Sequence, residues 1–221
     1  MSWESTVDYY RAINQGIKEA LGGLHSAKIV LYSVDFESIE KMQRSGDWAG
    51  AANLLIEAAN NIQAAGADFM LICTNTMHKV APQIESAIDI PLLHIADATA
   101  QALESAGIKT VGLLGTAFTM EQDFYKGRLI EQFGLQVLTP DQEDRKVIHN
   151  VIYDELCLGK RQANSKTEYL RIVEALENRG AEAVILGCTE IGLLIKQADT
   201  KTRLFDTTRI HAQKAVEIAL S

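Results

Sequence analysis

The sequence contains few cysteines and prolines, no surplus of positive charge and no long hydrophobic run. Its three cysteines are too few and too widely spaced for a disulfide framework or a zinc motif. With three prolines and no low-complexity stretch, no segment is a candidate for an interdomain linker. No apolar run reaches the roughly 18 residues of a membrane span. The opening residues, MSWESTVDYY, lack the features of a signal peptide, so we expect a cytoplasmic protein with reduced thiols.

The charge balance excludes one class of partner. The 21 Lys and Arg residues and 29 Asp and Glu residues give a net charge of -8. A phosphate backbone needs a basic surplus, so we expect no nucleic-acid partner. A small anionic substrate stays possible, because a site can be locally basic in an acidic protein. The length of 221 residues, 47% of them hydrophobic, fits one large domain or two smaller ones.

Short apolar runs alternate with longer amphipathic stretches along the chain. The runs are rich in Val, Ile and Leu and nearly continuous in apolar character, which is typical of buried parallel strands. We expect strands at 27–35, 67–74, 90–95, 110–115, 135–139, 181–189 and 202–206. Alternating strands and helices predict an α/β fold with helices on both faces of a parallel sheet.

Two strand ends resemble each other and indicate two similar halves. One apolar run ends in ICTNTMH near position 74, and another ends in LGCTEI near position 188. Each passes from a buried strand through a Cys-Thr pair into a helical pattern. Because the carboxyl ends of parallel strands form the binding crevice of an open sheet, the two strand ends are candidates for one site.

Cys188 is the first candidate for a reactive side chain. It follows a buried run that ends at Gly187, and Thr189 and Glu190 open the next helical pattern. A thiol at a helix N-terminus has a lowered pKa, because the helix dipole stabilises the thiolate. We therefore expect Cys188 to act as a base, and a buried structural cysteine is the alternative.

Hydroxyl and amide side chains gather in two further strand-to-helix turns. Thr74, Asn75 and Thr76 follow one strand, and the tract LLGTAFTM places Thr116 and Thr119 after another. Such residues cap helices, and with exposed backbone N–H groups they can also hold an anion. Together with the turn at position 188, these turns favour an anion site over capping alone.

Five tracts across the chain match one protein family in order and spacing. They are MSWEST, CTNTMH, LGTAFTM, GCTEIGLL and FDTTRIHA. The sequence resembles the aspartate/glutamate racemases, and it is most similar to the enterobacterial branch for aspartate, glutamate or broad specificity. The resemblance implies two similar parallel-sheet α/β domains related by pseudo-two-fold symmetry, at 1–95 plus 207–221 and at 96–206. It also implies a site between the domains, a small amino-acid substrate, no cofactor or metal, and a possible homodimer.

The resemblance assigns roles to individual residues. Cys188 would be the base on the L-substrate, and Thr74 would lie on the opposite face, where the family has its first cysteine. Cys73 comes one residue too early, and neighbouring side chains in a strand face opposite ways. Gln43 lies where relatives often place a guanidinium for the distal carboxylate, and Glu190 would polarise or shuttle protons. The positions that hold the substrate carboxylates are matched by Ser2, Asn75, Thr76, Thr116, Thr119 and Thr189.

The resemblance thus predicts an enzyme that inverts the α-carbon of aspartate or glutamate. Two alternatives remain open, because Thr74 replaces a cysteine. Members of the superfamily with a single site cysteine include carboxylate isomerases and decarboxylases. A protein that lost one catalytic residue could also bind carboxylates without turnover.

The start of the sequence departs from the family pattern. Relatives begin with a short apolar strand and a Gly-Gly turn before a tract like MSWEST. This sequence starts inside that loop. Because the loss of a central strand would expose ladder groups on its neighbours, we expect a mis-assigned start or a trimmed chain.

Overall fold

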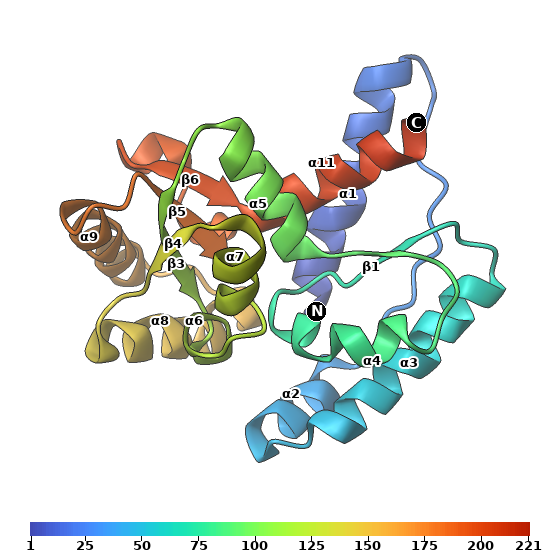
Figure 1. The fold of residues 1–221 in the computed structure, drawn as a ribbon, viewed down its shortest axis with the longest axis horizontal. Coiled ribbons are helices and arrows are strands. Elements are labelled where there is room, and N and C mark those ends of the chain that lie inside the picture. The colour runs from blue at the N-terminus through green and yellow to red at the C-terminus, as the bar shows by residue number, and fades with distance from the viewer.

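The computed structural model describes residues 1–221 as an α/β protein with two parallel sheets flanked by helices (Figure 1). The larger sheet has the order β4-β3-β5-β6, formed by Gln136–Leu138, Thr110–Gly115, Ala183–Gly187 and Arg203–Asp206. The smaller sheet pairs β1 (Met70–Leu71) with β2 (Leu92–Leu93). The predicted α/β class with parallel sheets is confirmed.

Helices separate the strands along the chain, as the alternation predicts. The α-helices are α1 Trp3–Leu21, α2 Phe36–Ser45, α3 Trp48–Ala64, α4 Ala81–Glu85, α5 Ile95–Ser105, α6 Ala117–Glu121, α7 Lys126–Phe133, α8 Gln142–Asp154, α9 Ala163–Asn178, α10 Ile191–Leu194 and α11 Thr207–Leu220. Short 3-10 helices are η1 Thr76–Val80, η2 Leu156–Leu158 and η3 Gln197–Asp199.

Two separate apolar cores hold the elements together. One contains 27 buried residues between Ile95 and Ile195 and surrounds the larger sheet. The other contains 10 buried residues between Ile39 and Ile84 and lies under the smaller sheet. The change from one core to the other falls between Ile84 and Ile95. The domain bounds at 95, 96 and 207 stay a prediction.

The central pair β3 and β5 fixes the edge where polar residues emerge. Their parallel register sets Gly115 beside Gly187. A Cβ on Gly115 would lie 2.9 Å from the Gly187 carbonyl oxygen, and one on Gly187 would lie 2.8 Å from the Leu114 carbonyl oxygen. Only glycine allows this close approach. The next residues along each strand, Thr116 and Cys188, therefore leave the sheet side by side.

The predicted strand at 27–35 is absent. The segment is extended, but its residues from Lys28 to Val34 make no backbone–backbone hydrogen bond, and Val30, Leu31 and Tyr32 are exposed. The apolar pattern correctly predicted an extended backbone. A β-strand also needs hydrogen bonds to a neighbouring strand, and this segment has none. The edge of β1 that β2 does not use has no strand beside it.

The C-terminal helix α11 packs along α1 and reaches α5, which joins the two ends of the chain (Figure 1). His211 of α11 is buried at this junction. Its Nε2 lies 2.8 Å from the carbonyl oxygen of Leu93, and its Nδ1 lies 2.8 Å from the hydroxyl of Tyr9. A carbonyl only accepts, so Nε2 donates and Nδ1 accepts from the tyrosine. His211 is thus held neutral between α1, β2 and α11.

Two further buried histidines lie next to His211, and their hydrogen bonds also favour the neutral ring. His78 donates from Nδ1 to the Thr74 carbonyl oxygen at 2.8 Å and accepts the Ile95 N–H at Nε2. His94 accepts the backbone N–H of Ala96 and caps α5. Burial lowers the pKa of His78 well below its ordinary value and lowers those of His94 and His211 to about 4.

These histidines should make stability depend on pH. An unfolded histidine has a pKa of about 6.5, so below that value the unfolded chain binds protons that the folded chain does not. The stabilisation is complete above pH 6.5 and is lost as pH falls toward 4. In His211→Gln, the difference in the free energy of unfolding between pH 7 and pH 4 should shrink by about 3 kcal/mol.

Urea unfolding followed by circular dichroism at both pH values measures this difference. The matched control is His25→Gln, which makes the same substitution at an exposed position. If His211→Gln keeps the full pH dependence of the parent chain, the neutral buried state of His211 is disproved.

Candidate active site

The predicted hydroxyls of the two halves meet at the carboxyl ends of the strands. Thr76 follows β1, and its Oγ1 lies 3.0 Å from Oγ1 of Thr116, which follows β3. Thr116 in turn lies 3.2 Å from the hydroxyl of Thr119 and caps α6. All three side chains are buried. The two turns predicted to hold an anion therefore form one continuous polar surface.

Three other predicted residues meet around the carboxylate of Glu190. It accepts hydrogen bonds from Ser2 Oγ at 2.6 Å, Thr189 Oγ1 at 2.7 Å and Cys188 Sγ at 3.0 Å. Glu190 is 3% exposed, so these donors replace water around its charge. The first residues of the chain and the end of β5 are thereby joined through one buried carboxylate.

The thiol of Cys188 does not have the lowered pKa that the sequence predicted. Burial raises the pKa of Cys188 well above its ordinary value, and the charge of Glu190 raises it further. The helix that follows, α10, contains only four residues and starts at Ile191. Such a short helix offers little dipole stabilisation, and the adjacent carboxylate opposes it. The resting residue is a thiol.

Glu190 is ionised in this arrangement. Burial raises its pKa, but the hydrogen bonds from Ser2, Thr189 and Cys188 lower it, and the pKa lies below its ordinary value. A carboxylate 3.0 Å from a thiol is a proton acceptor in contact with a proton donor. Cys188 and Glu190 together form a pair that can exchange a proton.

Thr74 and Cys73 differ in their surroundings. Hydrogen bonds reach Thr74 only through its backbone, whose N–H donates to Ile72 and whose carbonyl oxygen accepts from His78. Burial raises the pKa of the Cys73 thiol to about 11, and the Ser5 hydroxyl of α1 donates to the Cys73 carbonyl oxygen at 3.2 Å. Cys73 therefore lies toward α1, while the Thr74 hydroxyl has no protein partner.

Asn75 has one satisfied and one free polar atom. Its Nδ2 donates to Oγ1 of Thr207 at 3.1 Å, and Thr207 donates to the Leu186 carbonyl oxygen at 2.9 Å. Its Oδ1 is buried and has no hydrogen-bond partner. Thr207 was not predicted as a site residue, although it lies in the tract FDTTRIHA that carried the resemblance.

Gln43 is buried and joins the two halves. Its Nε2 donates to the sulfur of Met77 at 3.0 Å, and its Oε1 accepts from the hydroxyl of Tyr153 at 3.0 Å. Tyr153 lies on α8 and was missed from the sequence, because an aromatic residue on an amphipathic helix is typical of packing. Its hydroxyl shows that this helix contributes to the site.

Comparisons with known proteins show the family of the chain. Residues 1–215 match the family model described as Asp/Glu/Hydantoin racemase. The chain belongs to this family. The membership identifies it as an enzyme of the amino-acid racemase type and confirms the resemblance found in the sequence.

Solved structures and a curated relative are similar over most of the racemase. A structure from Yersinia pestis, described as a candidate Asp/Glu racemase, is 55% identical with a TM-score of 0.92, covering 100% of this chain and 96% of that chain. An aspartate racemase homologue from Pyrococcus horikoshii is 35% identical with a TM-score of 0.84, covering 99% and 95%. The broad specificity amino-acid racemase RacX of Bacillus subtilis is 22% identical over 170 residues, 76% of this chain and 71% of RacX.

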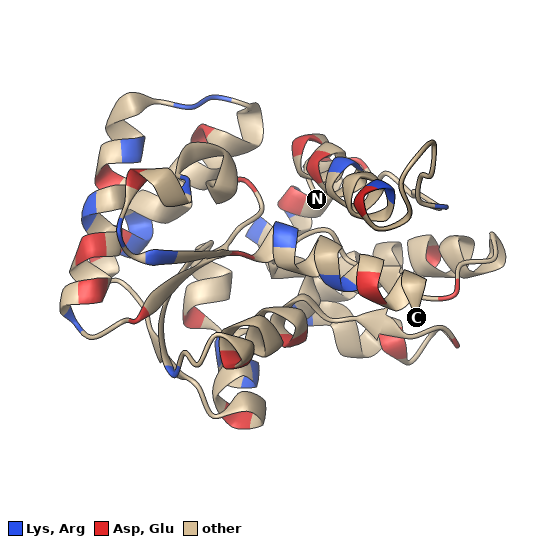
Figure 2. Cartoon of the chain, turned by 90° about the horizontal axis from the view of Figure 1, so that it is seen from above, with Lys and Arg blue, Asp and Glu red and all other residues tan.

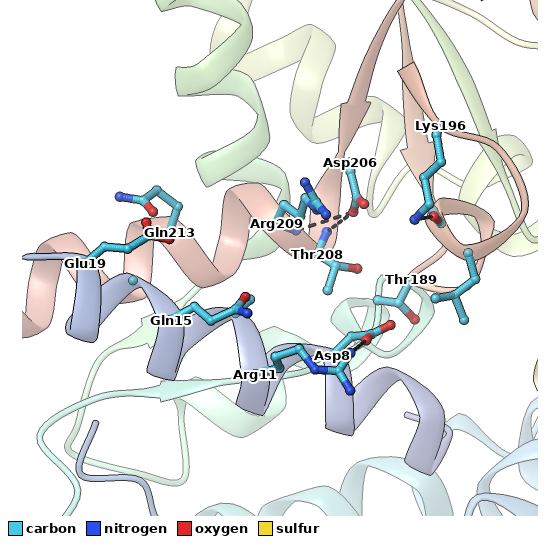
Figure 3. A pocket seen from close by; sticks show the side chains of 14 residues that line it. Asp8, Arg11, Gln15, Glu19, Thr189, Lys196, Asp206, Thr208, Arg209 and Gln213 are labelled. Atoms are coloured by element: carbon cyan, nitrogen blue, oxygen red, sulfur yellow. Dashed lines mark hydrogen bonds and ion pairs between the residues drawn. The ribbon is translucent and has the colours of Figure 1, made fainter. Parts of the chain in front are cut away.

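A polar hollow of about 420 Å³ lies away from the Thr76–Thr116 contact, between α1 and α11 of the racemase (Figure 3). Of the predicted site residues, only Thr189 lines it. Its walls mix acidic and basic side chains, including the Asp8–Arg11 ion pair. We therefore place the active site at the strand ends and not in this hollow.

Surface charge and membrane character were also predicted from the sequence. Lys and Arg side chains are interspersed with Asp and Glu over the molecule (Figure 2). None of the helices combines the length and apolar character that a membrane-crossing segment needs. The homodimer and the cytoplasmic location stay predictions.

The pairing of Cys188 with Glu190 predicts the effect of removing the carboxylate. In Glu190→Gln the negative neighbour is gone, so the pKa of Cys188 should fall and the thiol should react at lower pH. Alkylation by iodoacetamide across a pH series, quantified by peptide mass spectrometry, measures this, since Cys188 is partly exposed. Cys73 serves as an internal control because Glu190 does not influence its pKa. An unchanged or raised pKa of Cys188 would contradict the pairing.

Proposed function

We propose that the chain is a cofactor-independent racemase that inverts the α-carbon of an amino acid, with Cys188 as base on the L-substrate and Thr74 on the opposite face. The observation that carries the proposal is the Cys188–Glu190 contact of 3.0 Å at the end of β5. Aspartate and glutamate are the substrates that the family resemblance implies. They are the first to be tested.

Deprotonation begins with the resting thiol. The Cys188 proton passes to the Glu190 carboxylate, and the resulting thiolate is stabilised by the ammonium group of the bound amino acid. The thiolate then takes the α-proton, which restores the S–H bond and leaves the electron pair on the α-carbon and its carboxylate. Because Glu190 can accept the thiol proton, Cys188 can act as a base although its pKa is raised before substrate binds.

Binding of the substrate backbone would use the polar surface at the strand ends. Hydroxyls of Thr76, Thr116 and Thr119, with the backbone N–H groups of these turns, can donate to the α-carboxylate, where negative charge develops. The unpartnered Oδ1 of Asn75 is a buried acceptor suited to the ammonium group. These contacts hold the α-carbon between the two turns.

Thr74 makes the site asymmetric. A threonine hydroxyl can relay a proton from solvent water to the carbanion, and the proton held by Glu190 then neutralises the hydroxide left in solvent. The hydroxyl is too weak an acid to provide a base without assistance. Its hydroxyl has no protein partner, which leaves it available to the substrate or to water. Removal of the α-proton should therefore be easier from the L-face than from the D-face.

Replacement of the proposed base tests the assignment directly. Cys188→Ser should lower turnover by about a hundredfold or more, because a serine hydroxyl cannot supply the base. The matched control is Cys73→Ala, which should cost only packing. Chiral chromatography of L-aspartate and L-glutamate reactions measures turnover, and circular dichroism checks the fold. If the Cys73→Ala enzyme is folded but inactive, the assignment of the base to Cys188 and not to Cys73 is contradicted.

The asymmetry makes a second prediction. In D₂O, exchange of the α-proton should be fast from the L-enantiomer and slow from the D-enantiomer, and Thr74→Cys should raise exchange from the D-side. The overall equilibrium constant stays at one, because enantiomers have equal free energy in water. NMR of both enantiomers with both enzymes measures the rates. Equal exchange from both faces in the parent enzyme would show that a competent second base is present.

The same assays separate the alternatives. A carboxylate isomerase or decarboxylase would change the substrate without producing the opposite enantiomer. A binding protein would give neither product nor exchange. Only a racemase gives both α-exchange and inversion.

A further inference from the structure

The Gln43–Tyr153 pair lies beside the residues proposed to act on the α-carbon. Met77, which contacts Gln43, directly follows Thr76 in the chain. On the other side, the ring of His149 lies 4.9 Å from that of Tyr153 and accepts the N–H of Ala117, the residue after Thr116. The pair is therefore continuous with the Thr76–Thr116 contact, where the substrate backbone would bind.

This end of the site has no free positive charge. Neither Gln43 nor Tyr153 is hydrogen-bonded to a lysine or arginine. The amine of Lys79 lies 3.9 Å above the ring of Trp48 and donates to Gln122 at 2.7 Å, so it is already engaged. If the substrate had a second carboxylate, no cationic side chain at this end of the site would compensate for the water that the carboxylate loses on binding.

The electrostatic field at Tyr153 is negative. Burial raises the pKa of Tyr153 most, and the nearby carboxylates of Glu40 and Glu190 also raise it. The guanidinium of Arg44, which pairs with Glu40, is 70% exposed and belongs to the surface. A buried anion next to Tyr153 would thus be repelled as well as desolvated.

The hydrogen-bond pattern of the pair fits an amide. The Tyr153 hydroxyl gives its proton to Gln43 Oε1, so its lone pairs are what it offers to a ligand. The Gln43 Nε2 group has two protons, and its protein partner is a thioether, a weak acceptor. A side-chain amide can donate to the tyrosine oxygen and accept from Nε2. A carboxylate can only accept, so one of its oxygens would face a lone pair.

We propose that Gln43 and Tyr153 are the specificity-determining residues of the racemase and select uncharged, hydrogen-bonding side chains over carboxylates of the same shape. The inference rests on the proposed function. It names asparagine-like and glutamine-like side chains as the preferred class of substrate and places aspartate and glutamate below them.

Two isosteric substrate pairs test the inference on the unmodified enzyme. L-asparagine and L-aspartate have side chains of the same shape that differ in charge and in hydrogen-bond donors, as do L-glutamine and L-glutamate. The α-proton exchange in D₂O is followed by NMR. In at least one pair, kcat/KM for exchange should be about tenfold or more higher for the amide than for the acid. Equal rates within both pairs, or preference for the acid, would overturn the specificity assignment. Absence of exchange from all four would instead overturn the proposed function and the specificity with it.

Substitution at Gln43 should change the preference. Gln43→Arg adds a guanidinium at the side-chain end and should shift the amide-to-acid ratio toward the acid by about tenfold or more. Its control is Ser45→Arg, which adds the same charge at an exposed position of α2 and should leave the ratio unchanged. A folded Gln43→Arg enzyme with the parent ratio would overturn the role of Gln43.

Tyr153→Phe gives an independent test if the arginine variant fails to fold. Loss of the hydroxyl removes the acceptor for the amide, so the rate with the amide substrate should fall about tenfold while the rate with the acid changes less. The change should appear mainly in KM, because the contact is equal in ground and transition states. An equal fall for both members of a pair would overturn the role of Tyr153.

Discussion

The buried carboxylate of Glu190 is the constraint on which the site depends. Moving a carboxylate out of water costs several kcal/mol. Hydrogen bonds to a charged group contribute about 1.5–3 kcal/mol each, so the donors Ser2, Thr189 and Cys188 can offset that cost together but not singly. The carboxylate therefore fixes the start of α1 against the end of β5 and keeps the Cys188 sulfur protonated.

The backbone determines where that sulfur lies. Because Gly115 and Gly187 allow β3 and β5 to approach closely, Thr116 and Cys188 leave the sheet at one level. The hydroxyl contact between Thr116 and Thr76 then connects this edge to the turn after β1. The 3-10 helix η1 and the hydrogen bond from His78 to the Thr74 carbonyl oxygen stabilise that turn.

The sequence predicted the fold class and the residues that gather in the candidate site, because these depend on local patterns. The strand at 110–115 is continuous in apolar character and has the predicted bounds. The strand at 27–35 has the same pattern but lacks a neighbour, which local sequence cannot report. The prediction of a lowered pKa for Cys188 was wrong for a related reason. Burial of the thiol and the length of α10 depend on the tertiary structure and cannot be read from the local sequence. Tyr153 reaches Gln43 across 110 positions of sequence, and no spacing rule connects them.

Activation and specificity follow from the same negative field. Burial and the charge of Glu190 raise the pKa of Cys188, so in the proposed mechanism the thiolate would form when positive charge enters the site. An amino acid with an uncharged side chain brings its ammonium group, and its α-carboxylate is neutralised by the donors of the strand-end turns. An acidic side chain adds a second negative charge near Tyr153, where Glu40 and Glu190 already act. It would therefore bind less well and also oppose ionisation of the sulfur, so a single electrostatic cause would reduce both binding and proton removal.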